Sequence, residues 1–191
     1  MARIMFEQLS TKLQMMEKGV PNLEVSKQFQ CSKDELFKAW TDPEQLKQWW
    51  KPMGKQLTDV TDEIKEGGAI KYKFEDGLTI DGSYEKVVNG ELLEYTWNWH
   101  AAGQLMEDAA YKLSVKFEGD EHSSSISVVQ TGLNSKESVL PHEQGWEQGL
   151  QQLHDYLTGK PGNDSGVEPG QQKPPISGYN ETPEQEKVGG V

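Results

Sequence analysis

The sequence predicts an α+β fold in which a curved antiparallel sheet wraps around a long C-terminal helix. Two observations lead to this prediction. Segments with alternating apolar and polar residues follow one another, joined by pairs such as Asp76-Gly77 and Asn89-Gly90 that favour tight hairpins. After the last of these segments comes an amphipathic stretch at about 141–157, which is long enough to cover the apolar face of such a sheet.

The fold is expected to begin with a strand and a short helix. Residues 25–29 alternate between apolar and polar side chains and predict the strand. Ser32 and Glu35 have the spacing of a capping box, which predicts a helix from there through Trp40. Cys31 precedes the N-cap at the staple position, where we expect it to be buried as a small apolar group.

A second short helix and then six strands are expected next. Asp42 as N-cap and Pro43 as the first helical residue predict a helix that ends near Trp49-Trp50. The alternating segments, with further glycine-containing turns at 67–68 and 119–120, lie near 56–62, 69–75, 78–88, 91–100, 111–118 and 123–130. The middle of the domain is therefore expected to be an antiparallel meander.

The last helix is expected to bury one face. At about 100° per residue, this face gathers His142, Gly145, Trp146, Gly149, Leu150, Leu153, Tyr156 and Leu157. Each glycine in a helix interior costs about 1 kcal/mol relative to alanine, so the missing side chains call for a reason. Either the glycines let the helix pack closely on the sheet, or they leave room for a ligand.

Rows of aromatic residues are expected to face this helix from the sheet. Tyr95, Trp97 and Trp99 alternate with polar residues, so their rings point to one face. Tyr72 and Phe74 repeat the arrangement on another strand. Such rings can fill a core completely, or they can line an apolar cavity with a few polar tips. Both alternatives stay open.

Composition divides the chain into three regions. Residues 1–22 place apolar side chains at helical spacing and predict an amphipathic helical extension. Residues 23–158 carry all six tryptophans and form the expected folded domain. Residues 159–191 are acidic and rich in glycine and proline, with few large apolar groups, and predict a disordered tail.

Charge and composition exclude several classes of protein. With 31 acidic and 19 basic residues and a net charge of −12, the chain is not expected to bind nucleic acid. No apolar run approaches the roughly 18 residues of a membrane span, and the start lacks the apolar core of a leader, so we expect a cytoplasmic protein without membrane insertion. The single cysteine allows neither an internal disulfide nor a thiolate metal cluster.

Motifs for catalysis are mostly absent. The segment that starts at His142 begins like a zinc-protease motif, but Trp146 stands where the second histidine must be. We therefore expect no metal and no cofactor. His142 remains the one candidate for an acid, a base or a ligand anchor.

The chain also resembles a known superfamily. The resemblance covers about residues 23–158 and rests on these segments taken in order: Glu35–Glu44, Leu46, Trp49-Trp50, Glu66–Gly68, Gly82–Glu85, Gly145-Trp146, Leu150, Leu153 and Tyr156-Leu157. They are similar to the START-like, birch-pollen-allergen-like helix-grip (SRPBCC) superfamily, in the branch of the C-terminal domain of the activator of the ninety-kilodalton heat-shock chaperone ATPase. The resemblance implies a helix-grip fold, often with a cavity for lipids, polyketides or flavonoid-like compounds.

Three functions follow as hypotheses. The first is non-catalytic binding of a small hydrophobic, lipid-like or aromatic ligand between the sheet and the last helix, by Trp49, Trp50, Phe74, Tyr84, Tyr95, Trp97, Trp99, His142, Trp146, Gly149, Leu150 and Leu153. The second is a co-chaperone-like module that binds a chaperone or another protein, as a monomer or a weak dimer. The third is a small-molecule enzyme that uses His142.

Overall fold

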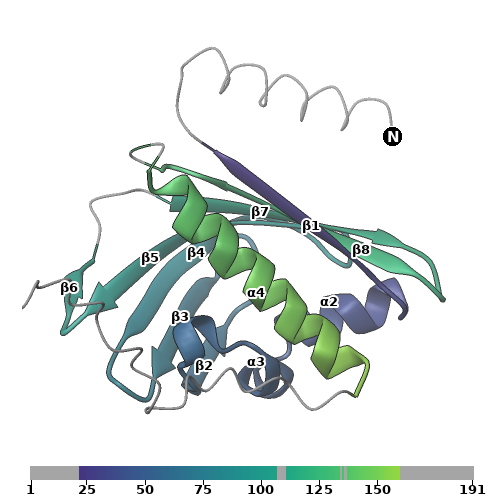
Figure 1. Cartoon of the computed structure of the whole chain (residues 1–191), viewed down its shortest axis with the longest axis horizontal. Coiled ribbons are helices and arrows are strands. Elements are labelled where there is room, and N and C mark those ends of the chain that lie inside the picture. The colour runs from purple at the N-terminus through teal and green to yellow at the C-terminus, as the bar shows by residue number, and fades with distance from the viewer. Residues whose placement is uncertain (1–21, 107–110, 134, 136, 160–191) are drawn as a thin grey trace, which may run out of the picture.

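The computed structural model describes residues 22–106, 111–133, 135 and 137–159 (Figure 1). Apart from residues 22 and 159, the extension expected at 1–22 and the tail expected at 159–191 lie outside the described residues. Within the described ranges, no helix is both long and apolar enough to cross a membrane.

The described chain forms one antiparallel sheet and its covering helices. In chain order the elements are β1 (Leu23–Phe29), α2 (Lys33–Thr41), α3 (Pro43–Trp49), the 3-10 turn η1 (Pro52–Gly54), β2 (Leu57–Asp62), β3 (Ala69–Phe74), β4 (Thr79–Val88), β5 (Leu92–Ala101), β6 (Gln104–Leu105), β7 (Tyr111–Gly119), β8 (Ser124–Thr131) and α4 (Val139–Leu157). The strands are ordered β1-β8-β7-β5-β4-β3-β2, and β6 pairs with β5. The predicted order of strand, two helices, strands and long helix is confirmed.

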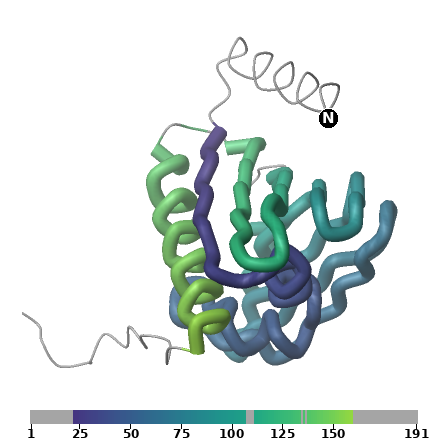
Figure 2. The backbone as a smooth tube through the Cα atoms, turned by 90° about the vertical axis from the view of Figure 1, so that its right-hand side faces the viewer, coloured from purple at the N-terminus to yellow at the C-terminus, as the bar shows by residue number. Residues whose placement is uncertain are grey.

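The sheet curls around α4, which crosses it diagonally (Figure 1). Figure 2 shows β1 running beside α4, while the sheet curves away from them toward β2. Because one face of each strand turns toward α4, burial alternates along the strands, most regularly in β8, whose buried side chains are Ser124, Ile126, Val128 and Gln130. The core therefore lies between the concave face of the sheet and the helices.

Helices α2 and α3 meet at a tight corner that local sequence explains. Ser32 Oγ accepts a hydrogen bond from the Glu35 backbone N–H at 3.2 Å, and the Glu35 carboxylate accepts one from the Ser32 backbone N–H at 2.9 Å. Asp42 ends α2 and caps α3, accepting from the Glu44 backbone N–H at 2.9 Å, while Pro43 opens α3. The predicted capping box and N-cap are confirmed.

The strand predictions hold within about two residues, and two short elements were missed. Strand β6 follows a turn at Ala102-Gly103, where both residues have positive φ, 52° and 75°. An alanine is uncommon in this conformation, so the turn carried no recognisable hairpin signal. In η1, Met53 also has a positive φ of 55°. Glycine is required in β4, where a Cβ on Gly82 would come within 2.0 Å of the Thr96 carbonyl oxygen of β5.

Helix α4 starts at Val139, earlier than predicted, and buries a narrower face than expected. Trp146, Gly149, Leu150 and Leu153 are buried. The prediction that Gly145 is buried is wrong: it is exposed, and a Cβ there would meet nothing within 4 Å. Gly145 lies roughly 90° around the helix from the centre of the buried residues, at the edge of the face.

Candidate functional site

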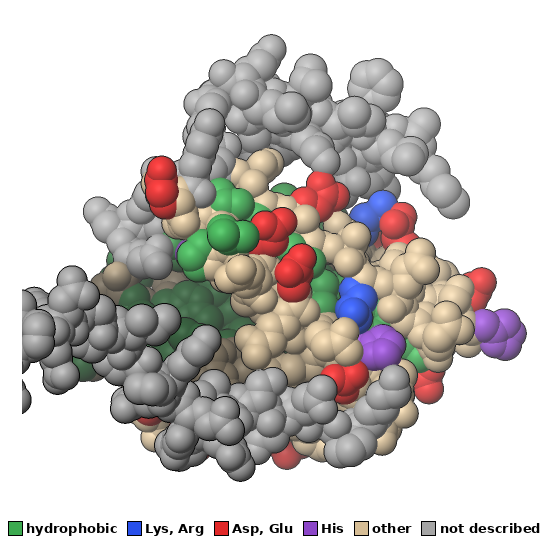
Figure 3. Space-filling view, viewed as in Figure 1, with side chains coloured by type: hydrophobic (Ala, Val, Ile, Leu, Met, Phe, Trp, Pro, Cys, Tyr) green, Lys and Arg blue, Asp and Glu red, His purple; other side chains and the backbone are tan. Residues whose placement is uncertain are grey.

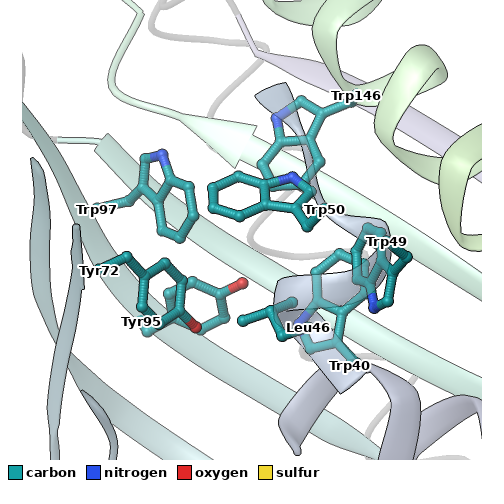
Figure 4. Close-up of a pocket in the computed structure, with 8 residues that line it drawn as sticks. All are labelled: Trp40, Leu46, Trp49, Trp50, Tyr72, Tyr95, Trp97 and Trp146. Atoms are coloured by element: carbon teal, nitrogen blue, oxygen red, sulfur yellow. The ribbon is translucent and has the colours of Figure 1, made fainter. Parts of the chain in front are cut away.

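A small aromatic pocket lies where α2, α3 and α4 meet the concave sheet. It is lined by Trp40, Leu46, Trp49, Trp50, Tyr72, Tyr95, Trp97 and Trp146 (Figure 4). The space open to the centres of water molecules is about 10 Å³, which is room for about one water. Aromatic rings therefore fill most of the volume between the sheet and the helices.

Side chains of the α2–α3 corner line one side of this pocket. The rings of Trp40 and Trp49 lie 5.6 Å apart, and Trp40 stacks on Trp146 of α4 at 6.2 Å and 17°. The Trp49 indole N–H donates to the Ala39 carbonyl at 2.8 Å, which fixes the ring against the end of α2. The corner made by the two caps thus positions Trp40 and Trp49 against Trp146.

Trp50 is at the centre of the aromatic cluster. Directly after α3, it places its ring 5.4 Å from that of Trp97, 5.8 Å from Tyr72 and 5.7 Å from Phe74. Figure 4 shows the Trp50 ring between Trp97 and Trp146. Gly149 of α4 lies next to this ring, and a Cβ there would be 3.6 Å from the Trp50 indole nitrogen, an ordinary contact. Close packing therefore does not require glycine at this position.

An apolar hollow opens beside α4. Figure 3 shows hydrophobic side chains gathered in a depression over the part of the sheet where Figure 1 places β4 and β5. Trp99 is only partly buried, and it stacks on Phe74 at 5.6 Å and 19°. Its ring also lies 6.2 Å from Trp50. The aromatic cluster thus extends from the pocket to a side chain that solvent reaches.

The partly buried carboxylate of Asp62 accepts hydrogen bonds from two tyrosines. The Tyr72 hydroxyl donates to Asp62 at 2.7 Å and the Tyr84 hydroxyl at 2.6 Å. Burial raises the pKa of Asp62 to about 6, although the two hydrogen bonds oppose this. Burial and the nearby Asp62 charge raise the pKa of Tyr95 well above its ordinary value.

Sequence reasoning missed Asp62 because of a register shift. Strict alternation from Leu57 places Asp62 on the outer face of β2. The pairing of β2 with β3 shifts between Leu57 and Asp59, so Val60 and Asp62 face inward instead. Nothing in the sequence marks this irregularity.

Gln130 and Trp146 form a buried polar pair near the pocket. Gln130 is only 1% exposed, and the Trp146 indole N–H donates to its side-chain oxygen at 2.7 Å. Its side-chain nitrogen has no hydrogen-bond partner within the described residues. The alternation of β8 places Gln130 on the same face as Ile126 and Val128, a signal that the sequence does contain.

His142 lies off the pocket, near the start of α4. Its Nδ1 lies 2.7 Å from the Ser138 carbonyl oxygen, so Nδ1 carries the proton in the neutral ring. The ring is 5.2 Å from that of Tyr111. In the part of the chain that the structure describes, no carboxylate forms an ion pair with His142. Among the described residues, the Nδ1 of His142 is therefore oriented by a backbone carbonyl and not by a carboxylate.

The predicted site residues separate into three groups. Trp49, Trp50, Tyr95, Trp97 and Trp146 line the pocket, which also takes Trp40, Leu46 and Tyr72. Phe74, Trp99 and Gly149 contact Trp50 from outside the lining. Tyr84, Leu150, Leu153 and His142 lie elsewhere, Tyr84 on Asp62 and the two leucines in the core.

No metal centre is evident in the described ranges. Among residues 22–106, 111–133, 135 and 137–159, no three His, Cys, Asp or Glu side chains gather so that they could hold a metal ion. Cys31 is partly buried, and burial raises the pKa of its thiol. The chemistry that the site offers is apolar and aromatic, with a few buried polar groups.

Known proteins share this fold. A protein from Arthrobacter aurescens has 20% identity and a TM-score of 0.64, over 77% of this chain and 91% of its own. The AHSA1 protein from Silicibacter pomeroyi has 21% identity and a TM-score of 0.61, over 72% and 98%. DynU16, from the dynemicin biosynthetic locus, has 22% identity and a TM-score of 0.59 over 73% of this chain, which spans about half (48%) of DynU16.

These likenesses confirm the helix-grip fold. No curated protein matches the chain significantly. The family model of activator of Hsp90 ATPase homolog 1-like proteins matches residues 30–158, which run from the end of β1 to the end of α4. This match contains every residue that lines the aromatic pocket. The chain therefore belongs to the family of activator of Hsp90 ATPase homolog 1-like proteins.

Proposed function

We propose that this protein binds a small hydrophobic molecule, lipid-like or aromatic and polyketide-like, between the curved sheet and α4. The observation that carries the proposal is the pocket itself, in which every lining residue except Leu46 is aromatic. Flat rings favour ligands that stack on them or meet them edge to face. The fold of DynU16, a protein of a biosynthetic locus, is consistent with a small-molecule ligand.

A ligand larger than one water must displace a side chain. Trp50 is best placed for this, because it follows α3 and its ring occupies the centre of the cluster. The backbone beside it is fixed, since Gln152 of α4 hydrogen-bonds both the N–H and the carbonyl oxygen of Lys51. The proposal therefore requires the Trp50 ring to turn while its backbone stays in place.

A ligand screen by NMR tests the proposal. The isotope-labelled full chain is titrated with fatty acids, flavonoids and naphthalene derivatives, and amide and indole shifts are followed. We expect a binding compound to shift Trp50, Trp97, Trp146 and Gly149, while the distant β7–β8 hairpin at 119–124 stays unchanged. If no compound class shifts these residues, or if shifts spread evenly over the surface, the proposal is wrong.

The family description supports a second candidate, a co-chaperone-like role. Leu105, Met106 and Leu140 are 46%, 52% and 58% exposed, and each is an apolar side chain that a protein partner could cover. The ATPase rate of a purified ninety-kilodalton heat-shock chaperone, measured with and without the protein, tests this role. Stimulation that Leu140→Ser weakens supports it, and an unchanged rate contradicts it.

A further inference from the structure

The side-chain amide of Gln130 is buried, and only its oxygen has a hydrogen-bond partner among the described residues. It is 1% exposed at the end of β8, and its cross-strand neighbours are Leu23 of β1 and Leu113 of β7. Both of these are apolar. The side-chain nitrogen Nε2 has no hydrogen-bond partner among the described residues. Buried polar groups are nearly always paired, so this one requires an explanation.

The orientation of the amide follows from its partner. The indole N–H of Trp146 can only donate, so the group 2.7 Å away must be the Gln130 oxygen. Turning the amide over would bring two donors together. Nε2, with its two N–H groups, is therefore not the atom that meets the Trp146 indole N–H, and it has no acceptor among the described residues.

The side chain is held next to the proposed binding region. Trp146 lines the aromatic pocket and stacks on Trp40, while its ring lies 6.1 Å from that of Trp97. Gln130 is not itself among the lining residues, and it adjoins the pocket through its hydrogen bond to Trp146. A buried donor without an acceptor among the described residues thus lies directly behind the aromatic wall.

We propose that Gln130 recognises a carbonyl-type oxygen on the ligand, donating a hydrogen bond to it from Nε2. The ligand is then an apolar molecule with an acceptor oxygen, such as a ketone, a quinone or an ester. Trp146 is the positioning residue, because its hydrogen bond fixes the direction of the amide. The inference rests on the proposed function, since it names the chemistry of the ligand in that site.

Two probes of the same shape separate this inference from the proposed function. 2-Acetylnaphthalene carries a carbonyl group, and 2-isopropenylnaphthalene replaces that oxygen with a methylene group. Both are titrated into the full chain and into Gln130→Met, which keeps the side-chain length but has no donor. Gln148→Met, an exposed position on α4, is the matched control.

We expect the affinity ratio of ketone to alkene to fall by about fivefold to tenfold in Gln130→Met and to stay unchanged in Gln148→Met. The ketone, and not the alkene, should also shift the Gln130 side-chain amide resonance in the unmutated chain. If Gln130→Met does not fold, the presence or absence of that shift in the unmutated chain tests the inference by itself.

Equal ratios in all three proteins together with an unmoved Gln130 resonance would overturn the inference and leave the binding function standing, with Nε2 serving a buried water only. If neither naphthalene binds, the inference is wrong and the proposed function loses its aromatic ligands as well. The two failures are therefore distinguishable.

Discussion

Asp62 is a carboxylate whose ionisation the fold opposes. Its ordinary pKa of 3.8 rises to about 6 because burial outweighs two tyrosine hydrogen bonds. The folded chain therefore holds the proton more tightly than the unfolded chain. This contribution to the free energy of unfolding is fully present below about pH 4 and is lost as the pH rises through about 6.

Asp62→Asn should remove this pH dependence. A pKa difference of this size corresponds to about 3 kcal/mol, and changed tyrosine hydrogen bonds reduce the gain. We expect the variant to be more stable than the unmutated chain by about 1–3 kcal/mol at pH 8 and nearly equal to it at pH 4. Urea unfolding at the two pH values measures the difference.

The control for Asp62 lies on the same strand. Asp59 is exposed and pairs with Lys73 at 3.0 Å, which lowers the pKa of its carboxyl. Asp59→Asn should therefore not stabilise the chain at pH 8. If both variants behave alike at both pH values, the account of Asp62 is wrong.

Sequence patterns found the aromatic residues better than the polar ones. Alternation correctly turned Tyr95 and Trp97 inward, because period-2 burial is set by the strand itself. Asp62 was missed because a register shift in β2 moved it to the inner face. Gln130 follows the same alternation as its apolar neighbours, so the pattern places it, but only the three-dimensional structure shows that its nitrogen has no partner among the described residues.

At the scale of elements, α2 depends on its N-terminal cap. Ser32→Ala removes the side-chain acceptor of the Glu35 backbone N–H and should lower the free energy of unfolding by about 1 kcal/mol. Ser26→Ala, at an exposed position of β1, serves as the control and should cost less. Urea unfolding of the two variants compares them, and equal losses would contradict the role of the cap.

Helix α4 contains two glycines with different surroundings. Gly145 is exposed with nothing near its Cβ position, so Gly145→Ala should raise the free energy of unfolding by about 1 kcal/mol. Gly149→Ala gains the same helix propensity, and its Cβ makes an ordinary contact with Trp50. Thermal unfolding should therefore show a rise for both variants, and a fall for Gly149→Ala would mean that α4 cannot accept even a methyl group against Trp50.

The elements that sequence missed are those without a strong local signal. The hairpins at Asp76-Gly77 and Asn89-Gly90 were predicted because these pairs favour tight turns. Strand β6 has two residues and follows an alanine in the left-handed region, which residue preferences alone do not predict. Strand β6 is defined by its backbone pairing with β5, a contact that its own residues do not predict.

At the scale of the whole molecule, the fold was predictable and the volume of the pocket was not. The order of elements follows from caps, turns and periodicity, all of which are local. The volume depends on how rings from four separate parts of the chain meet. The α2–α3 corner inserts Trp40, Leu46 and Trp49, and only about 10 Å³ stays open. The sequence pattern does not show how these side chains pack together, so it does not predict the volume of the pocket.

The contacts that hold α4 in place limit how the proposed ligand can bind. Gln152 holds the chain after α3, and Tyr156 donates to Gln45 of α3 at 3.3 Å, so α4 is attached to the helical corner as well as to β1. A ligand between α4 and the sheet must therefore fit beside a helix that is fixed along its length. The space for the ligand must therefore come from side chains that move.

The affinity of Gly149→Leu and Gly145→Leu for the tightest-binding compound of the ligand screen tests this account most directly. The two positions lie one turn apart on α4, one buried beside Trp50 and one exposed. A leucine at 149 occupies the space into which ligand and Trp50 must fit, so we expect at least about tenfold weaker binding there. Gly145→Leu should bind like the unmutated chain. Equal affinities in two folded variants would contradict a site between the sheet and α4.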